Sequence, residues 1–162
     1  MIIPEIRKIL YATDLSSNSL YAFNYAVLFA RQFGATITVV HVVEPAHATF
    51  GQEVKRMKEE EDREAAISEM DDRLSRFCRM ADRDMGCMGY VSKHIVRAGE
   101  PVEELLRVAE EESCDIFVLG SHGKGFLKQA LLGSVSRKVL DRAAKPVVII
   151  PLLVDLSWNK FL

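Results

Sequence analysis

Glycine and serine residues gather near the C-terminal end of the sequence in a pattern that could bind phosphate. Gly120-Ser121-His122-Gly123-Lys124-Gly125-Phe126 is followed, ten residues past Gly123, by Gly133-Ser134-Val135-Ser136. Without a Cβ, a glycine can take positive φ and lets the backbone approach a phosphate, so that its N–H can bond an oxygen. Ser134 would add a hydroxyl donor where a helix starts.

The same glycines have a plainer interpretation, which is a tight turn followed by an interrupted helix. Two familiar phosphate loops do not fit. Gly123-Lys124-Gly125 lacks the GK[ST] ending of a Walker A loop, and no four-residue gap between glycines precedes it. Nor does the segment follow a first strand, as the GxGxxG loop of a Rossmann dinucleotide site does. The conformational properties of glycine alone do not decide between a phosphate-binding loop and a structural turn.

Basic residues surround this segment. Between 124 and 145 six cations face a single acid, Asp141, and such a field favours an anionic ligand, although an ordinary solvated helix face would look the same. His122 could contact phosphate or ribose, or it could be a solvated loop residue. The six cations are Lys124, Lys128, Arg137, Lys138, Arg142 and Lys145.

Buried strands and amphipathic helices alternate along the chain and would position these residues. Apolar and β-branched runs predict strands at Ile9–Ala12, Thr36–Val43, Tyr90–Val96, Asp115–Leu119 and Pro146–Ile150. Apolar residues at helical spacing predict helices over 20–33, 67–81, 102–109 and 131–143. Because parallel neighbours need crossover connections, this order predicts an α/β fold: an open five-stranded parallel sheet with helices on both faces.

Ligands of open parallel sheets bind at the carboxyl ends of the strands, so the residues after each strand are candidates. Asp14 follows the first strand and could contact a ligand, or it could be a helix N-cap or turn carboxylate. His41, inside the second strand, is expected to pack in the core. The stretch 53–64 carries six acids and four bases, which predicts a solvated segment leading into a helix. Residues 51–64 are expected to be variable or mobile.

Length and composition predict one globular domain. The chain has 162 residues, 49% hydrophobic and 27% charged, and its 21 cations against 23 acids disfavour nucleic acid as the main ligand. Cys78, Cys87 and Cys114 are widely spaced, as expected for free thiols in a reducing cytosol. No apolar run approaches the roughly 20 residues of a membrane helix, and no signal peptide is recognisable, so we expect a cytoplasmic protein without membrane contact.

Gly120-x2-Gly123-x9-Gly133-Ser134 resembles the nucleotide-binding signature of the universal stress protein family, in its ATP-binding branch. Further motifs stand in the family's order, and the resemblance covers nearly the whole chain. They are Ile9–Asp14 as first strand and acidic turn, His41–Val43 as second strand end, Gly99–Pro101 as third-strand exit, and Lys145–Ile150 as last strand.

The resemblance implies a Rossmann-like fold of the adenine nucleotide alpha hydrolase type and an ATP, ADP or AMP ligand. Ala12, Thr13 and Asp14 would line the adenosine end, with Val42 as the adenine wall. Gly120 and Gly123 would lie against ribose and phosphates. Gly133, Ser134 and Val135 would hold the phosphate tail, and a divalent cation such as Mg²⁺ could accompany it.

The resemblance also implies a single domain over 1–162 and a homodimer joined through the last strand. The C-terminal extension 152–162 is rich in large apolar residues, which favours a covered location, and it could add to the dimer interface.

The leading functional hypothesis is a nucleotide-dependent stress-response or signalling module in which hydrolysis is slow or absent. No Ser-His-Asp set, metal cluster or water-activating carboxylate is recognisable, so no catalytic residue is assigned. Two alternatives stay open. One is an ATPase or nucleotide-using transferase with Asp14 or His122 as acid or base. The other is a protein-interaction domain with an empty pocket, against which the intact glycine spacing speaks.

Overall fold

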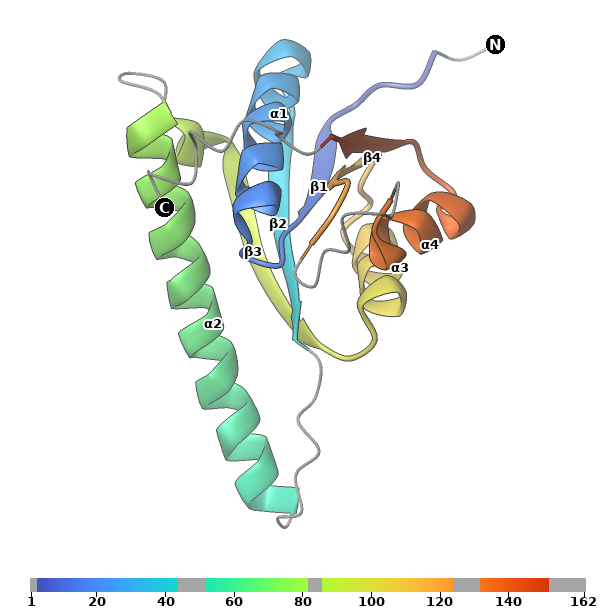
Figure 1. The fold of residues 1–162 in the computed structure, drawn as a ribbon. Coiled ribbons are helices and arrows are strands. Elements are labelled where there is room, and N and C mark those ends of the chain that lie inside the picture. Colours follow the sequence, from blue (N-terminus) through green and yellow to red (C-terminus); the bar gives the residue numbers. More distant parts are fainter. Residues whose placement is uncertain (1–2, 44–51, 82–85, 124–131, 152–162) are drawn as a thin grey trace.

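The predicted strands form one parallel sheet in the computed structural model, which describes residues 3–43, 52–81, 86–123 and 132–151. The strand order is β3-β2-β1-β4-β5, and every neighbouring pair is parallel. The open, parallel α/β sheet predicted from the alternation of strands and helices is therefore confirmed (Figure 1). The strands are β1 (Lys8–Ala12), β2 (Thr36–Val43), β3 (Val91–Ala98), β4 (Ile116–Gly120) and β5 (Val147–Ile150).

Helices cover both faces of the sheet. One face carries α1 and α2, and the other carries α3 and α4 (Figure 1). A short 3₁₀ helix, Cys87–Tyr90, precedes β3. The α-helices are α1 (Ser17–Phe33), α2 (Gln52–Ala81), α3 (Pro101–Glu111) and α4 (Ser134–Arg142).

Successive side chains of each strand point to opposite faces, so the sheet separates two hydrophobic cores. Ile9 and Tyr11 of β1 pack with α1 and α2, whereas Leu10, between them, packs with α3 and α4. All three are closed to solvent. Burial on both faces explains why the strands read as continuous apolar runs without polar alternation.

The carboxyl ends of four strands meet at one edge of the sheet. Ala12 pairs with Val40, and the N–H of Thr13 donates to the carbonyl of Val40 at 2.9 Å. On the other side of β1, the N–H of Ser121 donates to the carbonyl of Ile150 at 2.7 Å. The ends of β1, β2, β4 and β5 therefore lie side by side at this edge.

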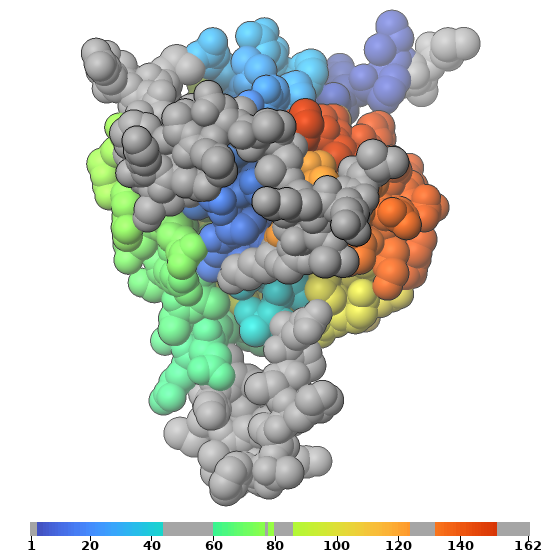
Figure 2. Space-filling model, in the orientation of Figure 1, coloured from blue at the N-terminus to red at the C-terminus, as the bar shows by residue number. Residues whose placement is uncertain are grey.

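Helix α2 starts earlier than the sequence predicts. The charged stretch 53–64 is the first part of a 30-residue helix, not a segment that leads into one. Residues 60–64 are exposed, whereas Met70 and Leu74 are fully buried. The first part of the helix extends past the sheet (Figure 1), and the coloured residues from 60 on stand out from the molecular surface (Figure 2). Apolar periodicity marks only the packed half of a helix, so the pattern begins near residue 67.

Other boundaries shift by a few residues. Strand β3 runs to Ala98, two residues past its predicted end, because Val43 still pairs with it there. The helix predicted over 131–143 begins at Ser134, after Leu132 and Gly133, and residue 131 lies outside the described residues. Helix α1 ends at Gly34, as predicted, in the left-handed conformation with φ of 64°.

The three cysteines, Cys78, Cys87 and Cys114, are free, as predicted, and all are buried. Burial raises the pKa of the Cys114 thiol from 9.0 to about 11, so this side chain packs as a small neutral group. Among the described residues, no helix combines the length and the apolar character needed to cross a membrane.

Candidate functional site

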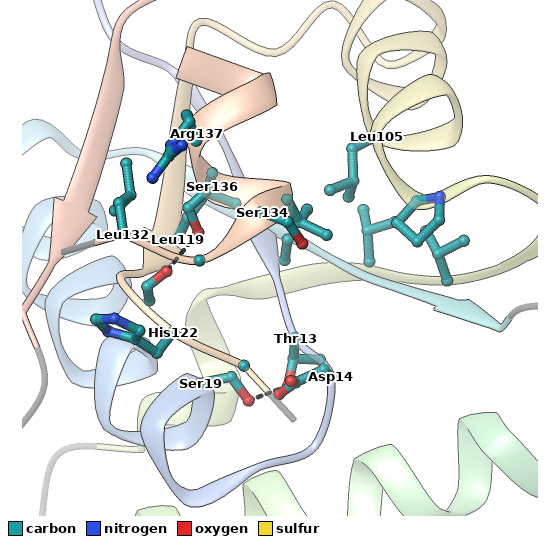
Figure 3. A pocket seen from close by; sticks show the side chains of 18 residues that line it. Thr13, Asp14, Ser19, Leu105, Leu119, His122, Leu132, Ser134, Ser136 and Arg137 are labelled. Carbon is teal, nitrogen blue, oxygen red and sulfur yellow. Dashed lines mark hydrogen bonds between the residues drawn. The ribbon is translucent and has the colours of Figure 1, made fainter. Parts of the chain in front are cut away.

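A cavity of about 420 Å³ opens at the carboxyl edge of the sheet, beside the start of α4 (Figure 3). Small-molecule sites typically measure about 300–1,000 Å³. All nine predicted site residues lie in its wall: Ala12, Thr13, Asp14, Val42, Gly120, Gly123, Gly133, Ser134 and Val135. The rest of the wall consists of Ser19, Val40, Pro101, Leu105, Leu119, His122, Leu132, Ser136 and Arg137.

Asp14 reaches the cavity from a sharp turn after β1. Its Oδ1 accepts the N–H of Ser16 at 3.0 Å, so Asp14 is a turn carboxylate, as the sequence allowed. Asp14 is not the helix N-cap, because Ser16 caps α1. Leu15 has a φ of 63°, a left-handed conformation that costs an ordinary residue about 1–2 kcal/mol. Burial of Leu15 and a 2.6 Å hydrogen bond from Arg73 Nη1 to its carbonyl hold this turn.

Thr13 shapes the same turn through hydrogen bonds inside the protein. Its Oγ1 lies 2.9 Å from Ser19 Oγ and accepts the N–H of Leu15 at 3.0 Å. Its carbonyl lies 2.8 Å from Nδ1 of His41, the histidine predicted to pack in the core, which is half-buried and tied to the site. Since these groups are engaged, Thr13 contributes to the shape of the wall more than to polar recognition.

Tyr11 anchors the start of α1 below this turn. Its hydroxyl donates to the carbonyl of Ser19 at 2.5 Å, and its ring lies 5.2 Å from that of Phe23. Burial raises the pKa of Tyr11 well above its ordinary value, so the hydroxyl remains a neutral donor.

The glycines of the β4 loop are required for space. The sequence also suggested positive φ at the glycines of this loop. Among the described glycines, however, only Gly34, Gly86 and Gly99 have a positive φ. A Cβ on Gly123 would lie 2.3 Å from Oδ2 of Asp14, and one on Gly133 would lie 3.1 Å from the carbonyl oxygen of Ser121. Small residues here let the loops after β1 and β4 and the start of α4 approach one another.

The N-terminus of α4 differs from those of α1 and α3. Ser16 caps α1, and Glu100 caps α3 by accepting the N–H of Glu103 at 2.8 Å. Gly133 is the N-cap of α4 and supplies no side-chain hydrogen bond. The first N–H groups of a helix have no acceptor within the helix and carry partial positive charge. The start of α4 therefore presents backbone donors to the cavity.

Hydrogen bonds hold α4 against the β4 loop. Ser136 Oγ donates to the carbonyl of Gly120 at 2.7 Å, and the N–H of Gly133 donates to the carbonyl of Ser121 at 2.7 Å. Oγ of Ser121 lies 2.9 Å from Nδ1 of His122, and both residues are buried. The interpretation of His122 as a solvated loop histidine is therefore wrong.

The cavity has an apolar end and a polar end. Val40 and Val42 of β2, Leu105 of α3 and Leu119 of β4 supply aliphatic surface, while Gly133, Ser134 and Ser136 supply polar groups. In Figure 3 the labelled residues run from Leu105 at one side, through Ser134, to Arg137 and Leu132 at the other. Such a wall suits an elongated ligand with a flat apolar group at one end and an anionic group at the other.

Most of the described members of the predicted basic cluster do not line the cavity. Among its described members only Arg137 lines the wall, while Arg142 pairs with Glu103 at 2.6 Å. Lys124 and Lys128 lie outside the described residues. Asp14 is the only acid of the described wall, so the two opposite charges come from the turn after β1 and from helix α4.

Two residues of α4 line the cavity although the sequence did not assign them to the site individually. Ser136 and Arg137 lie three and four residues after Gly133, which places them on the same helical face as the predicted phosphate contact. Helical spacing counted from Gly133 would have found both. The described residues contain no cluster of three metal-binding side chains.

A match to the universal stress protein family spans residues 5–151, and the chain therefore belongs to this family. Universal stress protein MJ0577 of Methanocaldococcus jannaschii is 28% identical over an alignment of 152 residues, which covers 89% of this chain and 94% of that protein. A solved structure of MJ0577 has a TM-score of 0.69 at 27% identity and covers 94% of this chain and 100% of that one.

Two solved structures with the same fold contain adenine nucleotides. A universal stress protein in complex with cAMP has a TM-score of 0.60 at 24% identity, covering 91% of this chain and 98% of that one. The universal stress protein from Archaeoglobus fulgidus in complex with dAMP has a TM-score of 0.54 at 21% identity, covering 91% and 99%.

Proposed function

We propose that this universal stress protein binds ATP at the carboxyl edge of its sheet and acts as a nucleotide-dependent stress-response or signalling module in the cytoplasm, with slow or no hydrolysis. The observation that carries the proposal is the start of α4, which lacks a side-chain cap and faces the cavity. The end of the cavity opposite this helix start is lined by aliphatic side chains. Helix N-termini bind phosphates through these backbone donors. The cAMP and dAMP complexes of two proteins with this fold support an adenine nucleotide.

Each part of ATP has a counterpart in the wall. Adenine would pack against Val42 and the aliphatic residues near it, with Ala12 and Thr13 closing that end. Asp14 would accept a hydrogen bond from a ribose hydroxyl. Gly120 and Gly123 would lie along the ribose and phosphates. The phosphate tail would be held by the N–H groups of Ser134 and Val135 and by the Ser134 hydroxyl. Gly133 would lie against the tail without donating, because its N–H is bonded to the carbonyl of Ser121.

Mg²⁺ is compatible with this wall as a companion of the phosphates. Mg²⁺ commonly keeps several waters and binds through one or two carboxylates together with substrate phosphates. Asp14 is the one carboxylate in the described wall, which matches this pattern and not a site built from protein ligands alone. The ion would neutralise part of the phosphate charge.

The rate of ATP hydrolysis distinguishes the proposed signalling module from an ATPase or nucleotide-using transferase. A single-turnover incubation with radiolabelled ATP and Mg²⁺, followed by separation of bound nucleotide, should recover intact ATP. Asp14 and His122 already have hydrogen-bond partners in the protein, Ser16 and Ser121, which disfavours them as a free acid or base. Formation of ADP or a transfer product above the rate of a contaminant control would instead establish an ATPase or transferase.

We also propose a homodimer joined through β5, the last strand in the sheet order. The carbonyls of Pro146 and Ile150 accept hydrogen bonds from Phe117 of β4 and from Ser121, which follows β4. By strand alternation the backbone groups of Val147 and Ile149 therefore point to the outer edge. A second copy could pair there, and residues 152–162, which lie outside the described residues, could add to the contact.

Proline at Ile149 should break this dimer, because it removes an outward N–H without removing a bond to β4. Sedimentation at micromolar concentration should give a dimer for the unaltered chain and for the matched control Ile149→Val, and a monomer for Ile149→Pro. A monomeric unaltered chain would refute the dimer.

A further inference from the structure

Arg137 is the only arginine or lysine in the described wall of the cavity. It lies in the second turn of α4, and its N–H donates to the carbonyl of Gly133 at 3.0 Å, as expected within the helix. Its side chain is exposed at the polar end, opposite Leu105 (Figure 3). A cation at this place faces the end where the proposed function puts phosphate.

The carboxylates of α3 do not neutralise Arg137. Glu103 pairs with Arg142 at 2.6 Å, and Glu104 pairs with Arg107 at 2.7 Å. Within the described parts of the chain, no carboxylate forms an ion pair with Arg137. The guanidinium therefore keeps its donors for an anionic partner, and an arginine fork matches the geometry of phosphate oxygens.

Arg137 lies further along α4 than the backbone donors proposed for the first phosphate. Arg137 follows Ser134 by three residues, which corresponds to a rise of about 4.5 Å along the helix axis. A single phosphate at the N–H groups of Ser134 and Val135 would be held at the first turn. Leu132 and Arg137 line the same cavity, so a longer phosphate chain would have to extend toward them for Arg137 to distinguish it.

We infer that Arg137 is a specificity-determining residue that makes the site prefer ATP over AMP by binding the outer phosphates. This inference rests on the proposed nucleotide site and names the ligand class within it: a nucleoside triphosphate, not a monophosphate. The start of α4 provides the affinity common to both ligands, and Arg137 provides the difference.

Calorimetric titration of the full chain with ATP, AMP and adenosine, in the presence of Mg²⁺, tests the inference. Arg137→Gln should weaken ATP binding about tenfold, which corresponds to about 1.4 kcal/mol. AMP and adenosine should change less than about twofold, the uncertainty expected for a site whose contacts are unaltered. Arg137→Lys should recover part of the ATP affinity, because it keeps the charge and loses the fork. Lys138→Gln, an exposed neighbour outside the wall, is the matched control.

The outcomes separate this inference from the proposed function. Equal weakening of ATP and AMP by Arg137→Gln, or no weakening of either, overturns the role of Arg137 and leaves nucleotide binding standing. A failure of the unaltered chain to bind all three ligands overturns the proposed function and the inference with it. Circular dichroism melting of Arg137→Gln at the unaltered temperature would confirm that the exposed substitution preserves the fold.

Discussion

Gly123→Val should weaken ATP binding at least about 100-fold, which corresponds to about 2.7 kcal/mol. A branched side chain at this position occupies the space through which a phosphate approaches the backbone of the β4 loop. It also displaces the carboxylate of Asp14, because the added Cβ would lie 2.3 Å from Oδ2. Hydrogen bonds to a charged group contribute about 1.5–3 kcal/mol each, so losing one or two of them accounts for the effect.

The fold should survive this substitution. Among the described residues, a Cβ on Gly123 would meet only the end of the Asp14 side chain, which can rotate, and φ at this glycine is not positive. Gly89→Val is the matched control, since nothing lies within 4 Å of a Cβ there and Gly89 is far from the cavity wall. Titration and thermal melting of both variants test the prediction. Equal ATP affinity in Gly123→Val and the unaltered chain would contradict the proposed phosphate position.

Asp14→Asn should weaken ATP, AMP and adenosine alike, by about tenfold or about 1.4 kcal/mol. The substitution keeps an oxygen that can accept the N–H of Ser16, so the turn is preserved. It removes the negative charge that would strengthen a hydrogen bond from a ribose hydroxyl. Because all three ligands contain ribose, the loss should not depend on the number of phosphates.

Competition titrations with the three ligands measure this pattern. Asp115→Asn serves as a control, because Asp115 accepts the N–H groups of Arg7 and Lys8 at the opposite edge of the sheet. A loss confined to ATP would place Asp14 at the phosphates, for example through Mg²⁺, and would contradict a ribose contact.

The order of strands and helices was predictable because burial determines it. Residues 36–43 must form a buried strand, since β-branched side chains on both faces require cover from helices, and the predicted bounds match β2. The start of α2 was not predictable in the same way. Residues 60–65 of this helix are exposed, and the sequence before residue 67 shows no apolar period, so it indicates only a solvated, charged segment.

The location of the site was also predictable, because the ends of parallel strands meet at one edge. The hydrogen bonds inside the site were less predictable from the sequence. The sequence places Thr13 in the wall, but the hydrogen bonds that engage its hydroxyl depend on Ser19, six residues away in α1, and on the left-handed turn at Leu15. Likewise, Arg137 and Lys138 look equivalent in the sequence. Only the position of each side chain around α4 distinguishes the one that lines the cavity.

Calorimetric titration of the purified, unaltered chain with ATP in the presence of Mg²⁺ tests the central claim most directly. Backbone donors at the start of α4, opposite an aliphatic end formed by β2 and α3, should give saturable binding of one ATP per chain at micromolar concentration, about −8 kcal/mol. Absence of heat and of saturation at millimolar ATP would show that this edge of the sheet does not bind nucleotide.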